Sequence, residues 1–482
     1  MLVVSKFGGS SVANSTQFKK VKNIIESNPY RNVVIVSALG KKEKGDSKIT
    51  DLLYLLHAHL KYNVPYDNIF DLIKTRFTNV RDDLGISFDL DKEFEELKKM
   101  LHKDISEDFL VSRGEYITAK LMAIYLGFSF VDSKDLIKFN YDGKVNYDKS
   151  YELIKNAYEN ETHLVIPGFY GSYLNGEIKT FSRGGSDISG AIISSALNAD
   201  YYENWTDVSG ILMADPKIID NAKIIKEISY EELRELSYMG ANVLHEETVF
   251  PVQKNNIPIR ILNTNRPNDE GTIITDNCAD KSQLITGISG KKHFTSFTIT
   301  KSTTSSKLKT LLDVLKVFDL FKVNIEHIPT GIDTFSCVVE SKDIEKIKYD
   351  LLTEIKKLDN VSDISIDEDI ALIAVVGRNM VDKPGISGKI FGIVGNNNIN
   401  IKMIAQGSQE LTIIVGVSNK DFENKMSNIN YIVISVSSEN DRLCFELQPR
   451  KAPITGMSSE WVKNYKEKIR FRPGIFLKQK CT

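Results

Sequence analysis

The sequence predicts an α/β body built on a mostly parallel sheet, followed by two smaller α+β modules. Short apolar runs rich in β-branched residues alternate with helical patterns over roughly the first 285 residues. Glycines and polar residues follow several of these strands, and a duplicated unit occupies the region after residue 287. Alternating strands and helices are typical of a parallel sheet covered by helices. Ligand-type residues at the strand ends indicate a site in the crevice there.

The first strand of this body runs from Leu2 to Phe7 and stops at Gly8 and Gly9, just before a polar helix start. Two adjacent glycines let backbone N–H groups approach a phosphate, and the helix N-terminus that follows adds its dipole. Lys6 places a mobile positive charge beside them. A purely structural βα turn is the alternative, because the run matches neither the dinucleotide nor the P-loop pattern.

The rest of the body continues the alternation of strands and helices. Residues 33–37 form a second buried strand, joined to the first by a helix over 17–27. Thr50 and Asp51 stand where a helix through Leu60 should be capped. Further expected elements are helices within 67–103, over 112–126 and over 188–197, strands over 128–132, 164–169 and 201–205, and a turn at 215–217.

An internal repeat follows the body. Residues 323–325 (Val-Asn-Ile) recur as 399–401 (Ile-Asn-Ile), and Gly331 recurs as Gly407, about 75 residues later. A fixed offset of this kind indicates a duplicated supersecondary unit. Each copy predicts strand, helix, strand, turn, strand and helix, and in the first copy these begin with 295–301, 308–318, 322–328 and 334–340.

Composition excludes several classes of protein. A net charge of -2 excludes a globally basic nucleic-acid binder. No apolar stretch approaches the roughly 20 residues that a membrane helix needs, and no signal peptide is evident. The four cysteines (278, 337, 444 and 481) lie far apart, which argues against a zinc site or a disulfide framework. We therefore expect a cytoplasmic protein with neither nucleic-acid nor membrane partners.

Four motifs in order resemble those of the aspartate kinases. They are residues 6–12 (Lys-Phe-Gly-Gly-Ser-Ser-Val), 113–115 (Arg-Gly-Glu), 182–187 (Ser-Arg-Gly-Gly-Ser-Asp) and 205–208 (Trp-Thr-Asp-Val). The resemblance covers about residues 1–423. It implies an amino-acid-kinase (carbamate-kinase-like) sandwich followed by two ferredoxin-like ACT domains. The implied domains are 1–286 for catalysis, 287–368 and 369–440 for two ACT units that can be intertwined, and 441–482 for an atypical basic extension.

The activity implied by the resemblance is transfer of the γ-phosphoryl group of ATP to the side-chain carboxylate of L-aspartate, the first step of lysine, threonine and methionine biosynthesis. The nucleophile is already an anion, so this reaction needs no general base. Cations, N–H donors and Mg²⁺, held mainly by the phosphates, must instead offset charge repulsion. The ACT pair implies feedback by lysine, threonine or both, in a homodimer or a dimer of dimers assembled through these domains.

The resemblance also carries over individual residues. Catalytic roles fall on Lys6, Arg183 and Asp187. ATP contacts fall on Lys6, Gly8, Gly9, Ser10, Thr206, Asp207, Leu212 and Lys217. Aspartate contacts fall on Ser37, Thr50, Glu115, Arg183 and Ser186. Effector contacts fall on Asn324, Ile325, Asp333, Asn400 and Ile401.

Each of these roles has a simpler alternative. Arg183 has the fork that suits a substrate carboxylate, or it is a surface arginine near a turn. Glu115 is the partner of the substrate ammonium, or a carboxylate on a helix surface. Thr50 and Asp187 are site residues, or only helix caps.

The sequence departs from the family pattern at two places. Asn242 stands where many relatives carry lysine. An amide cannot replace that charge, so Lys217 is expected to be the more important cation at the phosphates. After about residue 423 the expected last helix and strand are weak, and the tail is basic. A poorly packed extension, a frame change and a basic contact surface are the three interpretations of that tail.

Two other functions remain open from the sequence. One is a kinase of the same fold for another acid or for a nucleotide, such as acetylglutamate or uridylate. The other is an amino-acid sensor whose kinase core is weak or inactive, which Asn242 and the unusual tail motivate.

Overall fold

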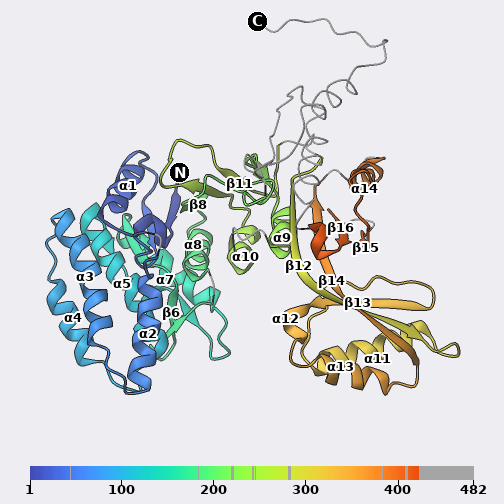
Figure 1. The fold of residues 1–482 in the computed structure, drawn as a ribbon. Helices are drawn as coiled ribbons and strands as arrows, with labels where there is room; N and C mark the ends of the chain where they lie inside the picture. The colour runs from blue at the N-terminus through green and yellow to red at the C-terminus, as the bar shows by residue number, and fades with distance from the viewer. Residues whose placement is uncertain are drawn as a thin grey trace, which may run out of the picture.

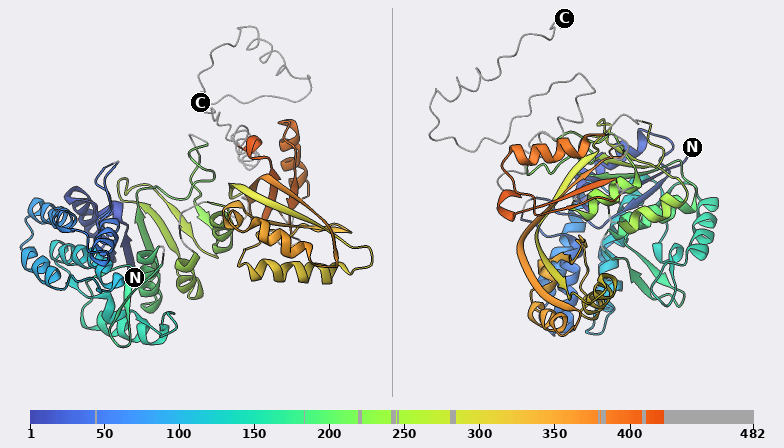
Figure 2. Two further views of the ribbon diagram at one scale, coloured as in Figure 1. Left: turned by 60° about the horizontal axis from the view of Figure 1, so that its bottom comes forward. Right: turned by 90° about the vertical axis from the view of Figure 1, so that its right-hand side faces the viewer.

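The computed structural model describes residues 1–43, 45–182, 184–218, 222–240, 244, 246–279, 284–378, 380, 384–407 and 411–422, with only the backbone at 246–249. Arg183, Asn242 and the predicted extension 441–482 lie outside the described residues. Figures 1 and 2 show two bodies side by side, an N-terminal α/β body and a C-terminal body, with α9 (Tyr230–Tyr238) and α10 (Glu246–Lys254) between them.

The N-terminal body is built on an eight-stranded sheet with the order β3-β5-β2-β1-β8-β10-β11-β9. Neighbouring strands pair in parallel except β10 with β11, which pair antiparallel. The strands are β1 (Val3–Phe7), β2 (Val33–Val36), β3 (Ser129–Phe130), β5 (Leu164–Pro167), β8 (Tyr201–Thr206), β9 (Glu227–Ile228), β10 (Ile259–Asn263) and β11 (Thr272–Ile274). This confirms the predicted mostly parallel sheet.

Helices cover both faces of this sheet. Alternate strand residues such as Val34 and Ile35 are fully buried on opposite sides, as the pleat requires. One face packs against α1 (Ser15–Glu26), α2 (Ile49–Lys61), α3 (Asp67–Leu84), α4 (Leu90–Lys99) and α5 (Glu107–Leu126), and the other against α7 (Tyr147–Asn160), α8 (Gly185–Ala196), α9 and α10. The result is the expected three-layer sandwich (Figure 1).

A small sheet borders this body beside α8. It consists of β4 (Lys138–Phe139), β6 (Tyr170–Tyr173) and β7 (Ile178–Thr180), with the short helix α6 (Ser133–Leu136) beside it. The ring of Phe139 contacts that of Phe181, with centroids 5.0 Å apart. These contacts fix the segment that leads into α8.

Three local predictions about the body were wrong. The helix after the polar loop begins at Ile49 with Lys48 as N-cap, so Thr50 lies inside its first turn and is not the cap. The N-cap of α8 is Gly184, whose φ of 73° suits glycine, so Asp187 also lies inside the first turn. The strand expected over 128–132 is reduced to β3, because Asp132 instead caps α6 by accepting from Lys134 N.

The C-terminal body is one five-stranded antiparallel sheet with the order β13-β12-β14-β16-β15. Its strands are β12 (Gly287–Lys301), β13 (Thr334–Glu340), β14 (Val361–Val376), β15 (Met403–Ala405) and β16 (Thr412–Val417). The long strands β12 and β14 pass through both repeat copies. The two α+β units therefore share a sheet, and the proposed boundary between residues 368 and 369 falls inside β14.

Each repeat copy has its own helices and its own core. In the first copy α11 (Lys307–Leu320), α12 (Ser341–Ile344) and α13 (Lys348–Lys356) enclose a cluster around Phe297 and Phe318, and in the second α14 (Ile386–Asn396) packs beside Ile373. Figure 1 shows the first group at one end of the sheet and α14 at the other.

The strand expected over 322–328 is wrong as a continuous element. Only isolated bridges form there, from His327 to Val338 and from Thr330 to Phe335. Pro329 between them has no N–H to donate to a ladder. The second copy has no proline at the matching place and forms β15. No helix in the described part of the chain is long and apolar enough to cross a membrane.

Candidate active site

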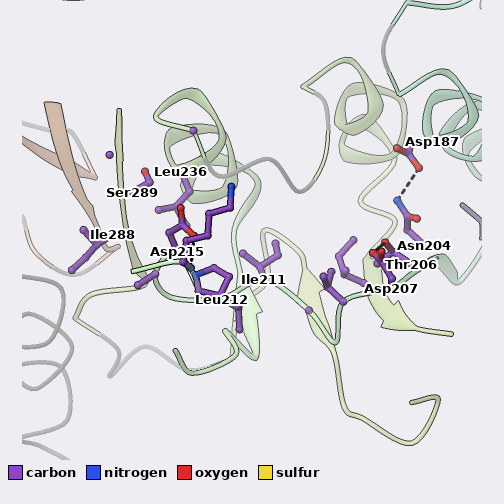
Figure 3. A pocket seen from close by; sticks show the side chains of 18 of the residues that line it. Asp187, Asn204, Thr206, Asp207, Ile211, Leu212, Asp215, Leu236, Ile288 and Ser289 are labelled. Atoms are coloured by element: carbon purple, nitrogen blue, oxygen red, sulfur yellow. Dashed lines mark hydrogen bonds between the residues drawn. The ribbon is translucent and has the colours of Figure 1, made fainter. Parts of the chain in front are cut away.

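The site is centred on Lys6, at the carboxyl end of β1. Its ammonium forms an ion pair with Asp187 on α8, and it donates to Asn204 Oδ1 on β8 over 3.4 Å. Asn204 Nδ2 in turn donates to Asp187 Oδ1 over 3.0 Å (Figure 3). Only 6% of Lys6 is exposed. Two neighbouring strands and a helix N-terminus thus place a buried cation, a carboxylate and an amide together.

The glycine turn follows directly. Gly8 N donates to Trp205 O over 3.0 Å, which fixes the turn to β8. Gly9 lies against the loop after β2, and Gly40 N donates to Gly9 O over 2.9 Å. Any side chain on Gly40 would meet the Gly9 carbonyl at 2.4 Å, so this approach requires glycine. Gly8, Gly9 and Ser10 all line the cavity beside Lys6.

A cavity of about 1210 Å³ on one side of Lys6 brings together four of the five predicted aspartate contacts. Ser37 follows β2, Thr50 lies in α2, Glu115 lies in α5 and Ser186 lies in α8, and all four line it. Lys41, Lys48 and Tyr54 line it as well, and the motif comparison did not identify these three.

Glu115 is the unusual group in this cavity. It is 4% exposed, and burial raises its pKa to about 8, although backbone hydrogen bonds from Ala38 and its own N–H oppose that shift. Its Oε2 has no hydrogen-bond partner in the structure. The alternative of a carboxylate on a helix surface is therefore wrong. A buried acceptor without a partner fits a cationic ligand group.

A second cavity, of about 440 Å³, opens on the other side of Lys6. Its lining includes Thr206, Asp207, Leu212 and Lys217, the other predicted ATP contacts. Apolar side chains from Ile211, Leu236 and Ile261 make up much of its wall (Figure 3). Lys6, Asp187, Thr206 and Asp207 line both cavities, so the two meet at the cation.

The five-stranded sheet of the C-terminal body closes part of this second cavity. Ile288, Ser289 and Gly290 of β12 line it opposite Asn204 (Figure 3). The sequence did not predict this wall, because β12 lies more than 80 residues beyond β8 in the chain. Periodicity alone identifies a strand but not the cavity it borders.

The predicted effector residues lie in the two matching turns of the repeat. Asn324, Asp333 and Asn400 are exposed, and Asp333 Oδ1 lies 3.0 Å from Lys301 Nζ. The segments beside these turns, 326–329 and 404–407, face each other and α9 across a cavity of about 700 Å³. Within the described ranges, no group of three or more His, Cys, Asp or Glu side chains could hold a metal ion.

Comparisons with known proteins agree with this architecture. The model of the amino acid kinase family matches residues 1–263, and a model of the ACT domain matches residues 373–431. Aspartokinase 3 of Bacillus subtilis is 31% identical over 433 residues, which cover 87% of this chain and 95% of that protein. The chain spans about half of bifunctional relatives such as the aspartokinase/homoserine dehydrogenase of Buchnera aphidicola, of which it covers 56%.

Solved structures match over almost the whole chain. The crystal structure of Clostridium acetobutylicum aspartate kinase is 46% identical with a TM-score of 0.82, covering 90% of this chain and 99% of that one. E. coli aspartokinase III, in complex with aspartate and ADP, is 24% identical with a TM-score of 0.70, covering 90% of this chain and 99% of that one. The second likeness supports the fold.

Proposed function

Since the chain belongs to the amino acid kinase family and is an aspartate kinase of that family, we propose that Lys6 and its neighbours transfer the γ-phosphoryl group of MgATP to the side-chain carboxylate of L-aspartate. The product is 4-phospho-L-aspartate. The bond from the β-γ bridging oxygen to the γ-phosphorus breaks, and a bond from a carboxylate oxygen to that phosphorus forms.

The observation that carries this proposal is the meeting of two different cavities at one buried cation. The polar cavity contains an unpartnered carboxylate, and the narrower one has apolar walls suited to an adenine ring. A carboxylate and a triphosphate repel each other, so a positive charge between them lowers the barrier most. Lys6 lies at that junction.

We assign the remaining roles from the same geometry. Glu115 binds the ammonium group of aspartate through Oε2. This oxygen is buried and has no hydrogen-bond partner among the described residues of the protein, so it is free to accept from the substrate. The N–H groups of the turn at Gly8 and Gly9 cradle phosphate oxygens. Asp187 and Asn204 hold Lys6 until the phosphate arrives. Arg183 lies outside the described residues, and its carboxylate-gripping role remains a proposal from the motif.

Mg²⁺ enters with ATP in this proposal. The described residues supply no cluster of ligands for a resident metal, while a nucleotide brings phosphate oxygens that Mg²⁺ prefers. Asp187 and Asp207 border the junction and can hydrogen-bond to water on the ion. The chain's own contribution is therefore orientation and positive charge.

For regulation, we propose lysine or threonine as the effector. The E. coli aspartokinase III structure with lysine and aspartate, labelled T-state, provides the precedent. The predicted effector residues remain a proposal for this chain.

We also propose a homodimer through the ACT region. Leu308 and Leu312 on α11 are 65% and 50% exposed one turn apart, an apolar stripe that a second copy would cover. Sedimentation equilibrium of a Leu308→Lys variant checks it, and an unchanged oligomeric state would contradict this surface. A cytoplasmic location stays a prediction from the sequence.

Trapping of the acyl phosphate with hydroxylamine tests the proposed function. The protein is incubated with MgATP and with aspartate, glutamate or acetylglutamate in turn, each with and without lysine and threonine. We expect hydroxamate from aspartate alone, and inhibition by one or both amino acids. Product from another acid alone would overturn the substrate assignment, and binding of lysine or threonine without any product would favour a sensor.

A further inference from the structure

A buried arginine outside every motif contacts the loop that borders the cavity proposed for aspartate. Arg76 lies in the middle of α3 and is 4% exposed. Within the described part of the chain, its polar contacts all go to the loop that joins β2 to α2, of which residues 40–43 and 45–47 are described. A buried guanidinium is costly unless it is paired and hydrogen-bonded, so its contacts indicate what it is there to hold.

Arg76 contacts both ends of this loop. Nη2 donates to Gly40 O over 2.5 Å at the start, and Nη1 donates to Ser47 O over 3.0 Å at the end. Nη1 also pairs with Asp46 Oδ2 at 2.9 Å. The planar fork of arginine reaches three acceptors at once, which the single ammonium of lysine does not.

Asp46 is the loop residue whose carboxylate pairs with Arg76. Its Oδ2 accepts from Lys42 N over 2.9 Å, and its Oδ1 accepts from Ser47 N over 2.8 Å. Burial opposes ionisation, but these two backbone hydrogen bonds and Arg76 together lower the pKa of Asp46. The Asp46 carboxylate therefore binds the backbone on both sides of the loop and pairs with the guanidinium of Arg76.

The clamped loop reaches the reaction site at two places. At its start, Gly40 N donates to Gly9 O, so Arg76 connects through Gly40 to the glycine turn beside Lys6. At its side, Lys41 lines the aspartate cavity, and Lys48 and Thr50 line it just after the loop. A displacement of the loop would therefore move both the glycine turn and this part of the lining of the aspartate cavity.

We propose that Arg76 is a positioning residue that sets the aspartate cavity and the glycine turn by clamping the loop from Gly40 to Ser47. It touches no substrate in this proposal and acts through Gly40, Asp46 and Ser47. The proposal rests on the proposed function for the identity of the substrate.

Steady-state kinetics of Arg76→Met form the first test, with Arg81→Met as the matched control. Arg81 lies on the same helix, and its ion pairs are with Asp82 and Asp91, away from the loop. We expect the KM for aspartate to rise roughly 10- to 100-fold, the loss expected from a small displacement of contacting groups. The KM for MgATP should rise by a smaller factor, because the adenosine cavity lies on the other side of Lys6 and only the phosphates meet the glycine turn.

Limited proteolysis adds a readout that does not depend on turnover. Trypsin cleaves after Lys41 and Lys42, which are exposed residues of the clamped loop. Cleavage there should be roughly tenfold faster in Arg76→Met than in the wild type or in Arg81→Met, since the loop opens more often. Equal cleavage rates together with an unchanged KM for aspartate would overturn the proposal.

Asp46→Asn covers the case in which Arg76→Met does not fold. Its side chain is 25% exposed, and an amide keeps the shape while removing the charge that faces Arg76. It should show the same split in KM and the same faster cleavage, more weakly. In the double variant the two effects should not add, because both remove one clamp. Additive effects, or wild-type behaviour of Asp46→Asn, would contradict it.

The two proposals fail in different ways. If aspartate is not the substrate, the wild type forms no hydroxamate from it, while the cleavage difference persists. If Arg76 is merely a core residue, the wild type is active and Arg76→Met loses thermal stability with both KM values and the cleavage pattern unchanged.

Discussion

The two cavities that meet at Lys6 are built in different ways. The cavity proposed for aspartate is formed within the kinase body, from β1, β8, α2, α5, α8 and the loop after β2, and it is polar with a buried carboxylate. The cavity proposed for the nucleotide is more apolar, and residues 288–290 of the ACT sheet form part of its wall. We infer that residues of the kinase body alone decide which acid is bound. The affinity for the nucleotide depends in addition on the position of the ACT sheet.

The contact that joins the two bodies supports this difference. Glu232 on α9 is completely buried and pairs with Arg378, just after β14, at 2.9 Å from Nη2 to Oε2. It also accepts from Thr286 and from Ser229 N. Leu236, one turn further along α9, lines the nucleotide cavity. An effector that favours one arrangement of the ACT sheet can thus bias the nucleotide side through α9.

The largest expected effect removes the group that the two cavities share. Lys6→Met should lower kcat roughly 10³-fold, because its charge stabilises the transition state more than either bound substrate. Both KM values should change much less. Initial rates over a grid of aspartate and MgATP concentrations measure this, and a large rise in the KM for aspartate with kcat preserved would refute the role of Lys6.

A change confined to the aspartate cavity should leave the nucleotide side untouched. Glu115→Gln should raise the KM for aspartate by roughly two orders of magnitude, because an amide cannot pair with the substrate ammonium in a buried site. The KM for MgATP should stay near that of the wild type. Isothermal titration with each ligand separates the two, and equal weakening of both would remove the distinction between the cavities.

The same residue predicts a pH dependence. With a folded pKa of about 8 against the ordinary value of 4.5, Glu115 binds more protons in the folded state, so its contribution to stability falls as pH rises from about 4.5 to 8. Aspartate affinity should instead rise through pH 8 as Glu115 ionises. Melting curves at pH 6 and 8 should show a smaller loss for Glu115→Gln than for the wild type. An identical pH dependence would contradict this account.

Breaking the ion pair between Arg378 and Glu232 should weaken inhibition by the effector without slowing the phosphoryl transfer. Arg378→Met leaves Glu232 buried without its cation and should cost about 3 kcal/mol in the free energy of unfolding. The kcat without effector should remain within about threefold of the wild type, since Lys6 is not touched. Inhibition by lysine or threonine should weaken. Urea denaturation and inhibition curves measure both, and full inhibition in a destabilised variant would exclude α9 as the connection.

The smallest effect concerns the nucleotide cavity alone. Lys217→Met should raise the KM for MgATP roughly fivefold, because a solvent-facing charge near the phosphates contributes only modestly to the free energy of binding. The KM for aspartate should remain unchanged. Lys223→Met is the control, because Lys223 lies six residues further along the chain and outside the cavity lining. No change in Lys217→Met would place the phosphates elsewhere.

Much of the kinase body and the site could be predicted from the sequence. The glycine turn, the helix that begins beside Asp187 and the strand that ends at Thr206 are local patterns, readable within a few residues. Their order along the chain identified the family, and a parallel sheet brings the carboxyl ends of its strands to one edge. Lys6 at the end of β1 pairs with Asp187 in α8, and Glu115 in α5 lines the same cavity. The alternatives for Thr50 and Asp187 as helix caps were wrong by two and three residues.

The sequence by itself determined the alternation of strands and helices, the residue types at the strand ends and the repeat, because these depend on periodicity and on the demands of single turns. Only the tertiary structure decided which distant groups meet. Asn204 beside Lys6, Arg76 on the loop at Gly40, and β12 against the nucleotide cavity are contacts between elements that do not follow one another in the chain. Their positions follow from how whole helices and sheets pack, which no local pattern specifies.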